Sequence, residues 1–143
     1  LLLAVLERRV GLDLAQVDVY ATAVGGVQVT EPGSDLPLAL AVVSAATSRC
    51  MAAQVVACGE VGLGGEVRQV AGLERRLHEA HRLGFHRAIL PASSPEPPVG
   101  MTAVRVATLA DAVVAAGLST GPVGSGVVVS ADPVVSTEVP PMG

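Results

Sequence analysis

The chain has 143 residues, of which 50% are hydrophobic, 15% charged and 1% aromatic, with a formal net charge of −4. This composition is too apolar for a disordered chain and predicts a single globular domain with an aliphatic core. All 9 basic residues are Arg, so the absence of Lys excludes a P-loop, a Schiff-base enzyme and a Ser–Lys dyad. The negative charge and the lack of aromatic residues also argue against a general attraction for nucleic acid and against a base-stacking platform.

The first ten residues are predicted to form the end of an apolar helix that stops at Gly11. No charged segment precedes them and no small-residue cleavage site follows, so they do not have the pattern of a signal peptide. The longest apolar run, Leu36 to Ala46, is too short to cross a bilayer. Because the chain also lacks an initiator Met, we expect residues 1–10 to be a truncated helix from a preceding domain. We further expect a cytoplasmic protein with no membrane partner.

Two strands are predicted before the centre of the chain. Apolar and polar residues alternate over residues 17–24, which is the period of a half-buried strand. Gly25-Gly26 then predicts a two-residue turn into a second strand over residues 27–29, so that the two strands form a hairpin.

A helix over residues 35–48 follows this hairpin. It is apolar on nearly every side, which predicts a place in the centre of the fold. Ser34 or Asp35 is expected to cap its first turn, where Pro37 is tolerated. Beyond the helix, Cys50 and Cys58 are too few for a disulfide framework and are predicted to be small core residues in a reducing compartment.

The second half of the chain alternates short strands with helices. Strands are predicted over residues 54–59, 66–70, 87–91 and 104–107, the last of these ending the sheet. Helices are predicted over residues 72–83, with Gly84 as the C′ residue, and over 109–116, opened by a Thr108–Asp111 capping box and ended by Gly117. Together these elements predict one mixed α/β domain over residues 1–118. Residues 119–143 are predicted to be a disordered tail in which only Val127 to Val129 has the pattern of a short edge strand.

Three local patterns are candidates for sites, and each has a simpler structural explanation. The Gly-rich segment 59–65 lacks the GxGxxG spacing and precedes a strand, so it predicts a hairpin turn with positive φ rather than a phosphate cradle. His78, His81 and His86 lack further ligands at a suitable spacing, which favours solvated histidines over a zinc site. Ser34 lacks a GxSxG context, which favours capping over a nucleophile elbow.

Positive charge is concentrated in residues 66–87, where five Arg and three Glu give a charge of +2 and leave −6 for the rest of the chain. The five arginines are Arg68, Arg75, Arg76, Arg82 and Arg87. One interpretation is a solvated helix face with ion pairs such as those of Glu79 with Arg75 and Arg76. The other is contact with a phosphate backbone or with an acidic neighbouring subunit. The residues alone favour the solvated face.

Three long segments carry a more specific signal: AVGGVQVTEPGSDLPLALAVVSA, GEVGLGGEVRQVAGLERRLHEAHRLGFHRAILP and VRVATLADAV. Over residues 23–118 the chain resembles the C-terminal Lon-protease-like domain of the RadA (Sms) family of bacterial DNA repair proteins. The resemblance implies the α/β fold of ribosomal protein S5 domain 2, a mixed sheet with helices.

The resemblance also locates the positions of the Lon-type catalytic dyad. In active Lon-type peptidases a Ser lies in a GPSAG-like loop and a Lys follows a GGL-like segment. Here the first position falls on Gly33 or, one residue later, on Ser34, and the second falls on Glu74. A Ser hydroxyl without an amine base is a weak nucleophile, so we expect no catalytic residues in this chain.

Full-length members of the family are DNA-dependent ATPases and helicases that form hexameric rings and act with a RecA-type recombinase on branched DNA. The resemblance implies that ATP, Mg and Zn belong to upstream domains and that this chain needs no cofactor. It implies a non-catalytic scaffold that self-associates and binds DNA weakly, with the five arginines as DNA or subunit contacts. Two alternatives stay open. One is the Lon-like domain of a magnesium-chelatase-type AAA+ protein, and the other is a serine peptidase whose base is His or Glu74.

Overall fold

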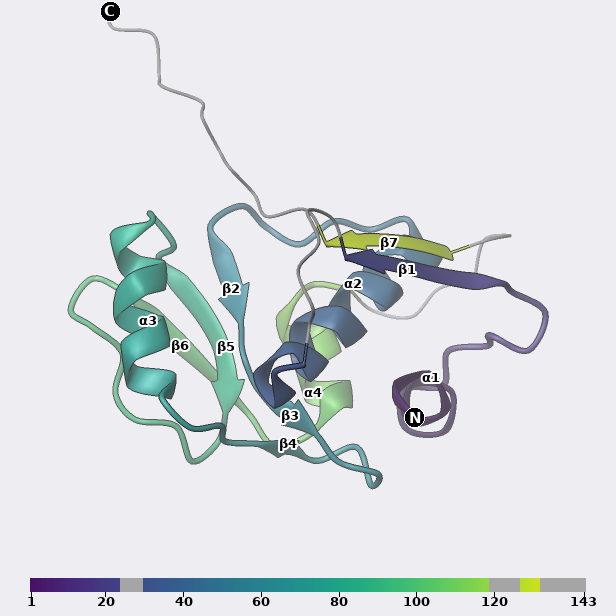
Figure 1. Cartoon of the computed structure of the whole chain (residues 1–143), viewed down its shortest axis with the longest axis horizontal. Helices are drawn as coiled ribbons and strands as arrows, with labels where there is room; N and C mark the ends of the chain where they lie inside the picture. Colours follow the sequence, from purple (N-terminus) through teal and green to yellow (C-terminus); the bar gives the residue numbers. More distant parts are fainter. Residues whose placement is uncertain (24–29, 119–126, 132–143) are drawn as a thin grey trace, which may run out of the picture.

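The structure is a computed structural model that describes residues 1–23, 30–118 and 127–131 (Figure 1). The helices are α1 (Leu2–Val5), α2 (Asp35–Thr47), α3 (Leu73–Arg82) and α4 (Leu109–Ala115). The strands are β1 (Val19–Ala23), β2 (Val55–Ala57), β3 (Glu60–Val61), β4 (Val67–Arg68), β5 (Arg87–Pro91), β6 (Thr102–Val106) and β7 (Val127–Ala131). The α/β class predicted from the sequence is confirmed.

A parallel three-stranded sheet in the order β2-β5-β6 forms the frame of the molecule. Strand β5 pairs in parallel with β2 on one side and with β6 on the other, so all three strands run in the same direction. In this register Val55 lies opposite Arg87, and Arg87 lies opposite Thr102. Parallel strands need long crossover connections. Between β2 and β5 that connection is the β3–β4 hairpin followed by α3, and Figure 1 shows α3 lying along β5 and β6.

Alternate residues of this sheet enter two separate hydrophobic clusters. On β5, Ile89 joins the cluster that contains the buried side chains of α2 and α4, whereas Ala88 and Leu90 join the cluster under α3. Because successive side chains of a strand point to opposite faces, the sheet lies between two helical layers. The same alternation directs Val56 of β2, and Cys58 just after that strand, toward α3.

Helix α2 occupies the centre of the larger cluster, as its apolar sequence predicts. Its buried residues are Leu36, Ala39, Leu40, Val42, Val43 and Ala46. The expected side-chain cap is wrong. Ser34 is at the N-cap position but makes no capping hydrogen bond, and the Asp35 carboxylate instead accepts a hydrogen bond from the backbone N–H of Val61 at 3.1 Å. This contact ties the start of α2 to β3 and uses the carboxylate that the sequence assigned to the cap.

The Gly-rich segment forms the predicted hairpin turn between the antiparallel strands β3 and β4. Gly65 has φ +82°, a conformation that L side chains rarely adopt, and its Cα faces the side chain of Arg9 from the N-terminal helix. The Gly65 carbonyl accepts a hydrogen bond of 2.7 Å from the Leu109 amide, which joins the turn to α4. The turn therefore serves packing.

Both ends of the 1–118 region contain the helices that the sequence predicts. Residues 2–10 are helical and end at Gly11, with Leu6–Val10 wound as a π-helical turn. Helix α4 begins at Thr108, whose hydroxyl accepts a hydrogen bond of 3.1 Å from the Asp111 amide, as the capping box predicts. In the part of the chain that is described, no helix is long and apolar enough to cross a membrane.

Three further predictions need correction or fall outside the described residues. Strand β6 is not the last, because β7 pairs in parallel with β1, with Val127 opposite Val19. This strand contains the short edge strand that the sequence allowed over Val127 to Val129 and extends it by Ser130 and Ala131, which were assigned to the disordered tail. The predicted second strand of the N-terminal hairpin, 27–29, lies outside the described residues, as does the rest of the tail. Cys50 is exposed rather than part of the core, because it follows the end of α2 in a loop, whereas Cys58 is half-buried.

Candidate functional site

Helix α3 presents one apolar face to the sheet and one charged face to solvent. Leu73 and Leu77, four residues apart, are buried against β5 and β6 in the smaller cluster. Gly84, with φ +95°, ends the helix as the sequence predicts. The charged residues between these apolar positions are exposed and form the basic part of the molecular surface.

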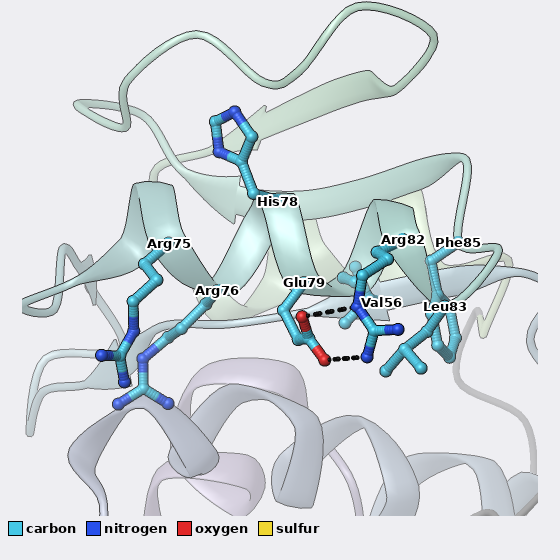
Figure 2. Close-up of a pocket in the computed structure, with 9 residues that line it drawn as sticks. Val56, Arg75, Arg76, His78, Glu79, Arg82, Leu83 and Phe85 are labelled. Carbon is cyan, nitrogen blue, oxygen red and sulfur yellow. Dashed lines mark hydrogen bonds and ion pairs between the residues drawn. The ribbon is translucent and has the colours of Figure 1, made fainter.

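The structure brings together three of the five arginines named as contacts. Arg75, Arg76 and Arg82 line one groove beside α3, whereas Arg68 on β4 and Arg87 at the start of β5 are exposed but do not line it. The groove has a volume of about 710 Å³ and also includes Val56, His78, Glu79, Ala80, Leu83 and Phe85. Figure 2 shows Arg75 and Arg76 pointing to the same side of α3 while His78 points away from them.

The ion pairs differ from the pattern that the sequence suggested. Glu79 pairs with Arg82, with an Nε–Oε2 distance of 2.9 Å, and not with Arg75 or Arg76 (Figure 2). The hydrogen bond from Arg82 holds the pKa of Glu79 below its usual value and raises the pKa of Arg82. Arg76 pairs with Glu31, which lies far away in the sequence. The spacing of residues along one helix therefore could not predict this ion pair.

Arg68 and Arg87, the two arginines of the basic stretch that lie outside the groove, differ in whether they form an ion pair. Arg68 pairs with Glu66 on the same hairpin. Within the described residues, Arg87 and the groove residue Arg75 make no ion pair. Among the five arginines of the basic stretch, these two guanidinium groups are therefore the ones that no described carboxylate engages.

The two dyad positions do not form a nucleophile–base pair. A Cβ at Gly33 would lie 3.1 Å from the Cys58 Sγ, so a side chain at this position would crowd that thiol. Glu74 is exposed in the first turn of α3, and its carbonyl oxygen lies 2.9 Å from the Nδ1 of His78. In the described part of the chain, no hydrogen bond joins the Ser34 hydroxyl to a carboxylate or an imidazole.

Two residues that the sequence did not single out as site candidates lie near the dyad positions or the groove. Cys58 lies beside Gly33, and burial raises the pKa of its thiol, although the nearby Arg76 guanidinium acts in the opposite direction. Phe85 lines the groove. Cys58 precedes the segment 59–91 and Phe85 lies within it, but only the folded chain places Cys58 beside Gly33 and Phe85 in the same groove as Val56.

Two of the three histidines, His81 and His86, are close in space but do not suggest a metal site. The rings of His81 and His86 meet edge to face, with centroids 5.9 Å apart. Among the described residues, no group of three or more His, Cys, Asp or Glu side chains is arranged to hold a metal ion.

Comparison with known proteins identifies the family. The chain is 47% identical over 115 residues to the DNA repair protein RadA of Salmonella typhimurium, a match that covers 79% of this chain and 25% of that protein. The chain belongs to the RadA family. RadA of Escherichia coli K12 is 46% identical over 115 residues, with 79% of this chain and 25% of the relative covered. RadA of Mycobacterium tuberculosis H37Rv is 44% identical over 110 residues, with 77% and 23% covered.

The chain thus spans about a quarter of the length of these RadA proteins. Residues 25–94 also match the family model described as subunit ChlI of Mg-chelatase. That segment includes α2, the β3–β4 hairpin and α3, and so contains the dyad positions and the groove. The predicted resemblance to RadA and the Lon-like fold class are confirmed.

Proposed function

We propose that this chain is a non-catalytic scaffold and DNA-contacting module of a RadA-like protein in DNA repair and recombination. The observation that carries the proposal is the identity of 44–47% to three proteins named DNA repair protein RadA over nearly four-fifths of the chain. Over that length, identity of this size points to a shared role and not only to a shared fold.

The chemistry of the dyad positions supports a non-catalytic role. The chain has no Lys to serve as the base, and Glu74 stands where the resemblance expects one. We therefore expect no hydrolysis of unfolded casein and no labelling of Ser34 by a fluorophosphonate probe. Labelling that disappears in Ser34→Ala would contradict this part of the proposal and favour the serine-peptidase alternative.

The proposed DNA contact relies first on Arg75 and Arg87, because these two of the five arginines in the basic stretch are exposed and make no ion pair with the described residues. An acidic chain held to phosphates by a few arginines should bind weakly, with a dissociation constant of about 10⁻⁴ M or more at physiological salt. The test is titration of labelled DNA with the full chain at several salt concentrations. Replacing both arginines with Ala should weaken binding and reduce the slope of log K against log salt by about one for each phosphate that is no longer neutralised.

Arg49→Ala is the matched control, because Arg49 is exposed but lies outside the basic stretch. The control should retain the binding and the salt slope of the unsubstituted chain. If the double variant and the control bind DNA equally, the basic stretch does not contact DNA and the proposal fails in that part.

The scaffold role extends to self-association in a ring-like homo-oligomer, with six subunits in the full-length protein. The expected environment is the cytoplasm, with a RecA-type recombinase as partner and with ATP, Mg and Zn held by other domains. Sedimentation velocity of the full chain over a range of concentrations tests the scaffold directly. A monomer at every concentration would contradict self-association through this domain.

A second candidate is the Lon-like domain of a magnesium-chelatase-type AAA+ protein, which the match of residues 25–94 favours. The matches to RadA cover 110 or 115 residues and so include more of the chain. DNA binding that depends on salt and is lost in the Arg75 and Arg87 double variant would favour the RadA-like function over the magnesium-chelatase-type function.

A further inference from the structure

The groove beside α3 has an apolar floor that phosphate binding does not explain. Val56, Ala80 and Phe85 are half-buried in it, and Leu83 is 61% exposed at the end of the helix. Figure 2 shows Leu83 and Phe85 side by side beyond Arg82. These side chains lie at the margin of the smaller hydrophobic cluster, where α3 leaves the β2 side of the sheet partly uncovered.

The rim of the same groove carries an excess of positive charge. Arg75, Arg76 and Arg82 line it, and Glu79 is the acidic residue among the lining side chains. Glu79 is engaged by Arg82 through two hydrogen bonds, and the carboxylate that engages Arg76 comes from Glu31 outside the groove. A positive rim around an aliphatic floor is complementary to a ligand that combines carboxylates with bulky apolar side chains.

We propose that this groove binds an acidic segment with bulky apolar side chains from a partner protein. A carboxylate of the segment would pair with Arg75, the groove arginine that makes no ion pair with the described residues, and an aliphatic side chain would enter between Leu83 and Phe85. DNA fits less well, since phosphates need only the arginines, and Phe85 is the single aromatic residue in the lining for a base to stack on. The volume of about 710 Å³ suits a few side chains of a peptide.

The probe is a fluorescein-labelled synthetic peptide of twelve residues in which Asp alternates with Leu, titrated with the full chain and followed by anisotropy. Two matched peptides, one with Asn for Asp and one with Ser for Leu, separate the contributions of charge and apolar surface. We expect each matched peptide to bind at least fivefold more weakly than the probe.

Two variants test the location. Leu83→Ser removes an apolar side chain from the floor of the groove, and Arg75→Gln removes a positive charge from its rim. Each variant should bind the probe about tenfold more weakly than the unsubstituted chain. Leu63→Ser is the control, since Leu63 is 73% exposed on the β3–β4 turn and does not line the groove. Thermal melting confirms that each variant is folded. If Leu83→Ser weakens binding of the probe no more than Leu63→Ser does, the proposal is overturned.

The same proteins separate this proposal from the proposed DNA contact. Leu83→Ser should leave DNA binding unchanged, whereas Arg75→Gln should weaken both DNA and the probe. Loss of DNA binding in Leu83→Ser would mean that the floor serves nucleic acid, and the partner segment would be rejected. The chain lacking residues 132–143 tests whether the chain's own C-terminal residues occupy the groove. If this shortened chain binds the probe more than tenfold more tightly than the full chain, residues 132–143 compete for the groove and the proposal of a partner protein is rejected.

Discussion

The two faces of the β2-β5-β6 sheet are covered to different extents. On the side of α2 and α4, 19 of the described residues form one buried cluster, to which the N-terminal helix also contributes. On the side of α3 the buried cluster has five residues, and its margin opens into the groove lined by arginines. We therefore expect stability to reside mainly on the first face, because on the second face the smaller cluster under α3 has a partly exposed margin. Each of the following predictions tests that division.

The largest effect is expected from truncating the centre of α2. Leu40 is 1% exposed, so Leu40→Ala should lower the free energy of unfolding by about 3–4 kcal/mol through reduced burial and the cavity left behind. Leu77→Ala, in the smaller cluster under α3, should cost about 2 kcal/mol because the open margin lets the site relax. Urea unfolding measures both. Equal costs would show that the two faces stabilise the fold equally.

A second prediction concerns Gly59, where the chain passes between the two faces. A Cβ at this position would lie 2.8 Å from a Val67 methyl carbon and 3.3 Å from the Pro91 ring. Gly59→Ala should therefore cost about 1–3 kcal/mol through overpacking. The control is Gly62→Ala, because the atoms nearest to a Cβ at Gly62 belong to the flexible ends of the Glu66 and Arg68 side chains. A smaller loss for Gly59→Ala than for Gly62→Ala would contradict the close packing around Gly59.

The cap of α4 should have a smaller effect. Thr108→Ala removes the hydroxyl that accepts the Asp111 amide and should cost about 1 kcal/mol, or about 4 °C in melting temperature. Thr108→Ser retains the hydroxyl and should lose less than half as much. Melting curves for the two variants that coincide would indicate that the cap contributes nothing.

The smallest expected effect is a difference between Cys50 and Cys58 in their rates of alkylation. Burial raises the pKa of the Cys58 thiol, so at neutral pH a smaller fraction of it is thiolate, and its alkylation rate should rise with pH later than that of an unperturbed thiol. Cys50 is exposed, so iodoacetamide should modify it faster than Cys58 in the folded chain. Single Cys→Ser variants assign the two rates, which should converge in urea. Equal rates in the folded protein would place Cys58 in open solvent.

Much of the fold follows from local pattern. The amphipathic period of 3.6 residues indicates α3, and a long apolar run indicates α2. The run from Arg87 to Pro91 coincides with β5, and the capping box marks α4. The pairing of β7 was not predicted: the sequence indicated a short edge strand over Val127 to Val129 but not its partner β1, which lies at the other end of the described chain. A parallel pairing over such a distance leaves no local signal.

The candidate site was less predictable for the same reason. The sequence identified all three arginines of the groove, because charge density is a local property. It did not identify the ion pair of Arg76 with Glu31 or the groove floor at Val56 and Phe85, since these contacts join separate segments. The assignment of Asp35 as a possible cap was wrong because a backbone amide of β3 competes for its carboxylate.

The parallel pairing of β1 with β7 has a consequence for the order in which the chain folds. Strand β1 leaves the ribosome early, but its partner leaves only after residues 24–126 have been made. The β2-β5-β6 sheet is closed by shorter loops, so we expect it to form first and the β1–β7 pair to form last. Until then the edge of β1 that later bonds to β7 is open, and an open strand edge is prone to pair with other chains. A chain that stops before Val127 would keep that edge open, and its tendency to aggregate would be permanent rather than transient.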